Sequence, residues 1–201
     1  IIIHGTNGLF GHCDGATIEN IHVKGVIESS SGTEVGDYGI SLGGICDFAR
    51  NTTFSHCTNN CIVIQNSSES GITGVGGILG SGVNCIIDSC SNYGRVTVQH
   101  SMSAGGIAGT LTGINTVNFC YNVANVTNYF YTGGIVGYAS SSEQTVTIGA
   151  TSVNETGGLI QLVKSSNEYS AAGGIIGFGR NVVFRSNSDY ANKASIGGAS
   201  D

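Results

Sequence analysis

A Gly-Gly-Ile step recurs five times along this 201-residue chain and constrains its fold more than any other feature. The copies are Gly43-Gly44-Ile45, Gly76-Gly77-Ile78, Gly105-Gly106-Ile107, Gly133-Gly134-Ile135 and Gly173-Gly174-Ile175. Between second glycines, the first three intervals are 33, 29 and 28 residues. Such a period is typical of repeat proteins, in which one supersecondary unit buries its apolar face only by stacking on copies of itself.

Five kinds of residue recur at fixed distances after the steps. They are the apolar Phe54, Ile87 and Val117, the cysteines Cys57, Cys90 and Cys120, the asparagines Asn59, Asn92 and Asn122, the compact Cys61, Gly94 and Ala124, and the β-branched Val63, Val96 and Val126. The opening segment follows the same count from Gly8, but Val23 replaces the asparagine. Alternation from Cys90 to Val98 has the period of two that is typical of a strand. Each interval is therefore predicted to form one coil.

The pattern predicts an all-β fold, a parallel β-helix or β-solenoid of about six to seven coils, with residues 1–201 in a single domain. Stacked coils lie about 4.8 Å apart and align like residues with like. Glycine is expected at corners because it accepts positive φ and lets backbones approach closely. Asparagine tolerates left-handed geometry and bonds nearby backbone, which favours an asparagine ladder at one turn. Ile, Val and Cys are expected inside.

Residues 140–172 depart from the regular spacing and are expected to form an irregular coil or to carry an insertion. The step at Gly174 follows Gly134 by 40 residues, with Gly157-Gly158 between them. An insertion is favoured over an abbreviated coil because Val146-Thr147-Ile148 keeps the expected apolar segment. The chain begins with Ile1 and has repeat material toward both ends, so we interpret it as a piece of a longer protein.

Composition excludes several classes of protein. The chain has 33 Gly, no Pro and no Trp, with 40% hydrophobic and 10% charged residues, which is typical neither of a helical nor of a disordered protein. No apolar stretch is long enough for a membrane span. The net charge is −6, and no basic stripe is available for a nucleic-acid backbone. We therefore predict neither a membrane span nor a nucleic-acid partner.

The glycine-rich segments resemble the GLUG repeat family. The segments that match are Gly105-Gly106-Ile107-Ala108-Gly109, Gly133-Gly134-Ile135-Val136-Gly137-Tyr138, Gly173 to Phe178 and Gly8-Leu9-Phe10-Gly11, with Cys90 to Val96 similar to the second half of the repeat. Such repeats occur in extracellular and surface-anchored proteins, including adhesin-like chains and the non-catalytic regions of some immunoglobulin A-cleaving metallopeptidases. The resemblance implies a spacer or binding surface, and the His-Glu-x-x-His zinc signature is absent.

The seven cysteines permit two interpretations. Cys57, Cys90 and Cys120 share one repeat position, so adjacent coils would bring them to a separation compatible with a disulfide. They can equally form a stack of buried thiols in the core, which is the interpretation we favour. Zinc binding by His56, Cys57 and Cys61 is not favoured because four convergent ligands are not evident. We predict no metal, no cofactor and no catalytic residue.

Four Asn-x-Ser/Thr sequences are candidate N-glycosylation sites in a secreted eukaryotic chain. They are Asn51, Asn66, Asn125 and Asn154, of which Asn66 and Asn154 lie in loop-like stretches and are the better candidates.

The sequence favours an extracellular or cell-surface structural or adhesive module, not an enzyme. Expected partners are glycans and further copies of the solenoid, joined end to end or continuing in a longer chain. The alternative is a carbohydrate-binding or carbohydrate-active (lyase-like or hydrolase-like) β-helix, for which Glu34 and Asp37 are the closest pair of carboxylates. That pair is interpreted as part of a solvated loop. Tyr129-Phe130-Tyr131 is either a stacking platform for sugars or a cap on a core or a neighbouring subunit.

Overall fold

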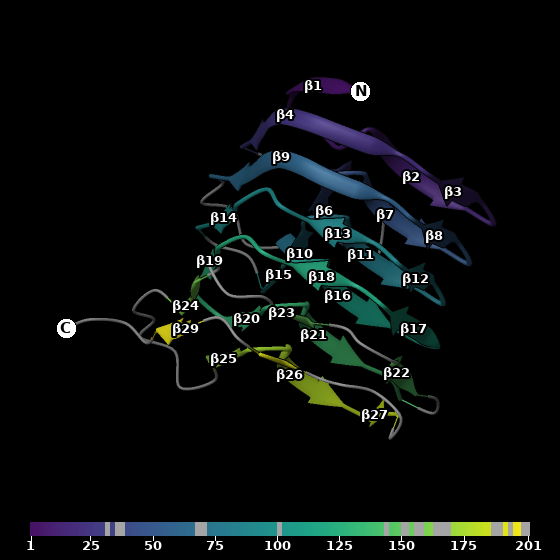
Figure 1. Ribbon diagram of the computed structural model, residues 1–201, viewed down its shortest axis with the longest axis vertical. Coiled ribbons are helices and arrows are strands. Elements are labelled where there is room, and N and C mark those ends of the chain that lie inside the picture. Colours follow the sequence, from purple (N-terminus) through teal and green to yellow (C-terminus); the bar gives the residue numbers. More distant parts are fainter. Residues whose placement is uncertain are drawn as a thin grey trace.

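The computed structural model is a parallel β-solenoid, which confirms the predicted all-β class. Strands from successive turns lie one above another from the N-terminal end to the C-terminal end of the stack (Figure 1). The structure describes residues 1–30, 33–34, 39–66, 72–99, 102–142, 145–149, 153–154, 159–162, 170–185, 191–192 and 195–197. Within these ranges, there is no helix that could cross a membrane.

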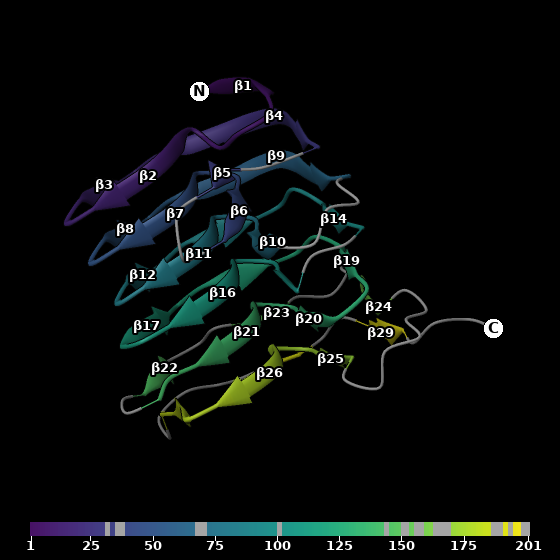
Figure 2. The same ribbon diagram turned by 180° about the vertical axis from the view of Figure 1, so that it is seen from behind.

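Each turn passes through four sheets. Sheet I contains β2 (Phe10–Asp14), β7 (Cys46–Arg50), β11 (Leu79–Val83), β16 (Ala108–Thr112), β21 (Val136–Ser140) and β26 (Ile176–Arg180). Sheet II contains β3 (Thr17–Glu19), β8 (Thr53–Ser55), β12 (Ile86–Asp88), β17 (Asn115–Asn118), β22 (Val146–Ile148) and β27 (Val182–Phe184). The strands of sheet I form a continuous stack in the view from behind (Figure 2).

The remaining two sheets complete the turn. Sheet III begins with β1 (Ile2–Gly5), β4 (His22–Ser29) and β9 (Thr58–Gln65), and then has two short strands in each turn: β13 (Ser91–Asn92) and β14 (Val96–Val98), β18 (Tyr121–Asn122) and β19 (Val126–Asn128), β23 (Val153–Asn154) and β24 (Leu159–Leu162), β28 (Ala191–Asn192) and β29 (Ser195–Gly197). Sheet IV contains β5 (Thr33–Glu34), β6 (Ile40–Gly43), β10 (Ile72–Gly76), β15 (Ser103–Gly105), β20 (Tyr131–Gly133) and β25 (Ala171–Gly173). Only β5 runs antiparallel among the described strand pairs.

The register of the sheets follows the sequence repeat. The first glycines of the five steps are aligned partners in sheet IV, in the order Gly43, Gly76, Gly105, Gly133 and Gly173. Val146–Ile148 forms β22 and pairs with β17, so the long interval before Gly173 is a single turn. Gly157 and Gly158 lie outside the described residues. Equal repeat positions therefore lie in vertical columns.

The number of turns is smaller than predicted. About four turns, from β6 to β24, have a strand in every sheet and a neighbouring turn on both sides, whereas we predicted six to seven coils. Before them, β2, β3 and β4 precede the antiparallel β5, and after them β25 to β29 form an end turn. Counting repeat positions overestimates the number of enclosed turns, because an end turn has only one neighbour against which to bury its apolar side chains.

The glycine steps owe their residue type to close packing. An added Cβ on Gly44, Gly77, Gly106 or Gly134 would overlap a carbonyl oxygen of the next turn and an asparagine side chain, belonging to Asn59, Asn92, Asn122 or Asn154 respectively. The predicted close approach of backbones is thus confirmed. The predicted positive φ at the steps is wrong. Positive φ occurs instead at the corner between sheets I and II, for example at Gly15, Asn51 and Asn84. It also occurs at the corner between sheets II and III.

Candidate functional site

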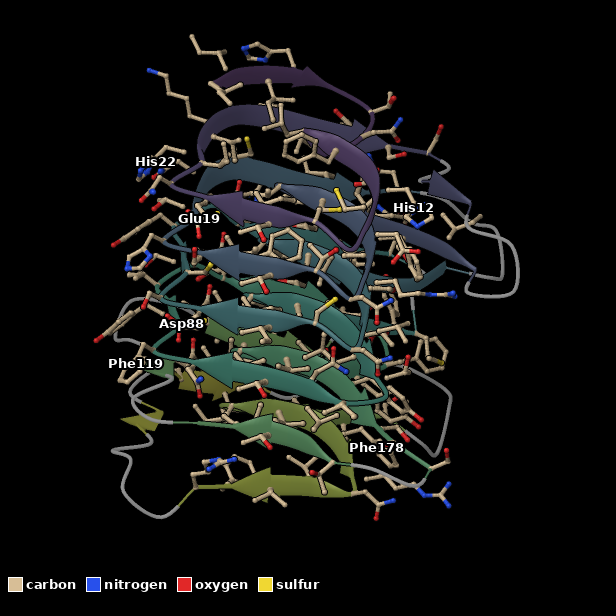
Figure 3. All side chains as sticks on the ribbon, turned by 90° about the vertical axis from the view of Figure 1, so that its right-hand side faces the viewer. His12, Glu19, His22, Asp88, Phe119 and Phe178 are labelled. Atoms are coloured by element: carbon tan, nitrogen blue, oxygen red, sulfur yellow. The ribbon has the colours of Figure 1, made fainter. Side chains whose placement is uncertain are left out.

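The corner between sheets II and III carries the most distinctive outer surface of the described solenoid. We call this surface the corner ridge and define it by Glu19, Asn20, His22, Ser55, His56, Asp88, Ser89, Ser91, Tyr93, Asn118, Phe119 and Tyr121. Glu19, His22, Asp88 and Phe119 lie along the same side of the stack, opposite His12 and Phe178 (Figure 3). The ridge therefore unites residues that are distant in sequence.

The backbone at the apex of the ridge is left-handed in successive turns. Asn20, His56, Ser89 and Phe119 have φ values of 56°, 52°, 54° and 49°. Each residue immediately precedes the position of the cysteine column, so the same corner is built at each level. Left-handed geometry suits Asn and is unfavourable for a bulky aromatic residue. Phe119 is the exception in residue type at this column.

Three aromatic side chains are exposed on the ridge. Tyr93 is 54% exposed, Phe119 46% and Tyr121 39%. Tyr121 pairs with Ser91, two residues before Tyr93, so the two tyrosines are diagonal neighbours, with Cα atoms roughly 8 Å apart from the strand spacing and rise per residue. The sequence repeat did not predict this cluster. One signal was available, since Phe119 immediately precedes Cys120, whereas polar residues precede the equivalent Cys57 and Cys90.

Two carboxylates of the ridge occupy one outward column of sheet II. Glu19 pairs with Ser55, and Ser55 pairs with Asp88. Two strand spacings separate their backbones by roughly 10 Å. The Ser89 hydroxyl donates a 2.9 Å hydrogen bond to Asp88 Oδ2. The described residues contain no group of three or more His, Cys, Asp or Glu side chains that could hold a metal ion.

Cys57, Cys90 and Cys120 lie directly above one another inside the solenoid. Ser91 N–H donates to the carbonyl of Cys57 and Tyr121 N–H donates to that of Cys90, which fixes the column. All three side chains are buried, and all seven cysteines are free thiols in the structure. The pKa of the Cys57 thiol is raised, mainly by a hydrogen bond with Cys90 and to a smaller extent by burial. The column has the environment of buried thiols, and strand spacing also satisfies disulfide separations.

The other metal and carboxylate candidates do not form a site. His56 is exposed on the ridge, whereas Cys57 and Cys61 are buried, so these three side chains do not converge on a zinc ion. The backbone of Glu34 lies in β5, but its side chain and all of Asp37 lie outside the described parts of the chain. Their interpretation as a solvated loop stays a prediction.

Three of the four candidate glycosylation sites are exposed. Asn51 Nδ2 donates to Asp14 Oδ1 at 3.2 Å, Asn66 Nδ2 donates to Glu28 Oε1 at 2.7 Å, and Asn125 Oδ1 accepts from the Leu159 amide at 2.7 Å. Glycosylation at all four sites stays a prediction. The Asn154 side chain is buried, and its Oδ1 accepts a 2.9 Å hydrogen bond from Asn122 Nδ2. A glycan on Asn154 Nδ2 would require the asparagine ladder to open.

Tyr131 belongs to an aromatic cluster on the opposite side from the ridge. Its ring centroid lies 5.4 Å from that of Tyr138 and 4.9 Å from that of Phe178, while Tyr138 and Phe178 stack at 5.1 Å with an interplanar angle of 6°. These contacts join sheet IV to sheet I. The ring packing resembles a cap between sheets more than an open platform for sugars.

The fold defines the class of protein as a parallel β-solenoid repeat protein. Comparisons with protein-family models, curated proteins and solved structures found no match to this chain. Its function is therefore inferred from its own columns and surfaces.

Proposed function

We propose that this chain is a non-enzymatic structural and adhesive module of an extracellular or cell-surface protein, and that its repeats belong to the GLUG family. Two features support the structural part. The segments beginning at Gly105 and Gly133 occupy the same place in successive turns, as the repeat requires. The buried polar groups of Asn59, Asn92 and Asn122 bond from turn to turn. Internal ladders of this kind make a rigid spacer.

The exposed aromatic cluster of the corner ridge carries the adhesive part of the proposal. Holding a residue in a sparsely populated backbone region costs roughly 1–3 kcal/mol, and such residues concentrate at functional sites. Phe119 combines this backbone with a 46% exposed side chain, at a column filled elsewhere by Asn20, His56 and Ser89. Exposed aromatic side chains with rigid backbones are the usual anchors of binding surfaces.

Carbohydrate is the partner class that suits the ridge. Tyr93 and Tyr121 each offer an apolar ring face and a hydroxyl, which together match the alternating apolar and hydroxyl surfaces of a sugar. Hydrogen-bonding side chains of Ser91 and Asn118 occupy outward positions on the flanking strands. The adhesive ligand is therefore proposed to be an extended, weakly charged glycan bound along the ridge.

A glycan array probed with the whole chain tests this proposal. Phe119→Asn and Tyr121→Ala are each expected to weaken binding by roughly tenfold, the loss of one anchor residue. Ile114→Asn is the matched control, because Ile114 is exposed in the same turn but lies outside the ridge. Absence of binding to every glycan, or equal binding by Phe119→Asn and the wild type, would contradict the adhesive function.

The carbohydrate-active alternative has one supporting observation, the column shared by Glu19 and Asp88. Their backbone spacing of roughly 10 Å is slightly above the roughly 6.5–9.5 Å that separates the two carboxylates of inverting glycosidases. Release of new reducing ends or unsaturated products from a bound glycan, with and without Ca²⁺, distinguishes the two functions. We expect no turnover, and turnover that disappears in Glu19→Gln or Asp88→Asn would replace the adhesive function with an enzymatic one.

A further inference from the structure

The last described turn exposes apolar side chains that its predecessors bury. A hollow of about 580 Å³ is lined by Ile175, Ile176, Gly179, Asn181, Val182 and Phe184. Phe184 is 48% exposed, whereas Ile148, its partner in the preceding turn, is fully buried. The difference arises because the described residues place no further turn over this face. An apolar surface of this kind favours contact with another protein surface.

The same turn repeats the side chains of an earlier one. Phe178-Gly179-Arg180-Asn181-Val182-Val183-Phe184-Arg185 matches Phe48-Ala49-Arg50-Asn51-Thr52-Thr53-Phe54-Ser55 at both phenylalanines, the arginine and the asparagine. Within the chain, the earlier segment pairs with the first turn, so that Phe48 lies beside His12, Arg50 beside Asp14 and Phe54 beside Ile18. The rings of His12 and Phe48 meet edge to face at 5.1 Å.

We propose that the last turn of one copy stacks on the first turn of a second copy in this same column register. It would pair with the other edges of β2 and β3, since β7 and β8 already occupy one edge of each. Phe178 then lies beside His12 of the second copy, and Phe184 covers its Ile18. Arg180 lies beside Asp14 of the second copy and Arg185 beside its Glu19, so opposite charges face each other in two columns. Because the two surfaces differ, the contact is head to tail and generates an open filament. This inference rests on the structural part of the proposed function.

One segment must move for the copies to meet. β1 pairs with β4 and occupies the place in sheet III that β29 of the other copy would take. It is weakly held, since its register partners lie only on β4 and Ile2 is 65% exposed. In the assembly, Ile196 of β29 continues the inward column of Ile27 and Val63. β1 is therefore a replaceable cover that slows association.

Complementary charge reversal tests the register. One variant carries Arg180→Glu with Arg185→Glu, and the other carries Asp14→Lys with Glu19→Lys. Each variant alone is expected to associate roughly tenfold more weakly than the wild type, because like charges face each other at the junction. An equal mixture is expected to form filaments again, because every junction then pairs opposite charges. Sedimentation and electron microscopy measure both results.

Two further variants make the test decisive. Ile3→Asp loosens β1 and is expected to strengthen association, while Arg95→Glu changes an exposed charge in a middle turn and is expected to have no effect. Monomers for both wild type and Ile3→Asp at high concentration would overturn the proposal, as would a mixture no more associated than its components. Glycan binding by the monomeric Arg180→Glu/Arg185→Glu variant, whose substitutions lie outside the corner ridge, shows separately whether the adhesive function stands.

Discussion

At the scale of single residues, asparagine serves two unrelated purposes in this solenoid. Asn51 and Asn84 are exposed and hold left-handed corners, as the type tolerates. Asn59, Asn92 and Asn122 are buried, and each carboxamide bonds both to the next ladder asparagine and to the backbone two residues ahead. The second arrangement satisfies polar groups that would otherwise be costly inside a core.

Asn92→Ala tests the ladder. The change removes the acceptor of Asn59 Nδ2 and the donor to Asn122 Oδ1, both at 2.8 Å, and we expect a loss of about 2 kcal/mol in the free energy of unfolding. Urea denaturation measures the loss. Asn60→Ala is the control, since Asn60 is exposed on β9 beside the ladder residue Asn59 and should change stability by less than about 0.5 kcal/mol. Equal effects of the two substitutions would refute the ladder's contribution.

Phe119→Asn should separate stability from binding. Asparagine relieves the left-handed strain at φ 49°, and little burial is lost because the side chain is 46% exposed. We expect a stability gain of about 0.5–1 kcal/mol in the same denaturation assay, together with the loss of glycan binding proposed above. Phe119→Ala is the control, since it removes the ring but lacks the carboxamide with which asparagine tolerates the left-handed region. A less stable Phe119→Asn variant would show that the ring supports the fold.

At the scale of the element, the glycine step and the ladder asparagine form one unit. The second glycine of four of the five steps lies against the asparagine of its own turn and under the carbonyl of the next turn. The two residue types recur together because the space for the carboxamide exists only where the facing residue lacks a Cβ. This contact explains why the glycine step and the ladder asparagine recur together in the sequence, which neither composition nor the flexibility of glycine explains.

Gly106→Ala tests the unit. The new Cβ would overlap the Gly134 carbonyl and the Asn122 side chain, so we expect a loss of about 1–3 kcal/mol in stability. Gly5→Ala is the matched control, because no atom lies within 4 Å of its added Cβ. Thermal and urea unfolding of both variants measure the difference, and a neutral Gly106→Ala would mean that the turns tolerate wider spacing than the structure shows.

At the scale of the whole molecule, the buried thiols link stability to pH. Burial raises the pKa of Cys61 and of Cys85 to about 11. The folded state therefore holds these protons more tightly than the unfolded chain does, and the associated stability is complete below the unfolded pKa of about 9 and is lost as pH rises toward 11. The solenoid should consequently weaken in mildly alkaline solution.

Cys61→Ala isolates this effect, because Ala124 occupies the same column two turns away. We expect the urea midpoint of the wild type to fall between about pH 9 and pH 11, and that of Cys61→Ala to fall less. The difference between the two proteins removes the contributions that both share. A parallel pH dependence in both would place the alkaline sensitivity elsewhere.

Column membership was predictable from the sequence. Strands stack at a fixed spacing, so residues at equal repeat positions must align, and Gly43 with Gly76 or Asn59 with Asn92 could be paired by counting. The thiol column followed for the same reason. The site was not predicted, because the aromatic residues of the corner ridge stand at a position where the repeat has no fixed residue type.

Tertiary structure alone decided which column members are buried, and how many turns are enclosed. The sequons at Asn154 and Asn66 both lie in loop-like stretches of the sequence, yet the Asn154 side chain lies in the ladder and the Asn66 side chain in solvent. Whether a side chain faces inward or outward depends on the left-handed corners. One residue more or one residue fewer at a corner would move every side chain of the following strand to the other face. Enclosure depends on neighbours above and below, which is why counting steps predicted more coils than the core contains.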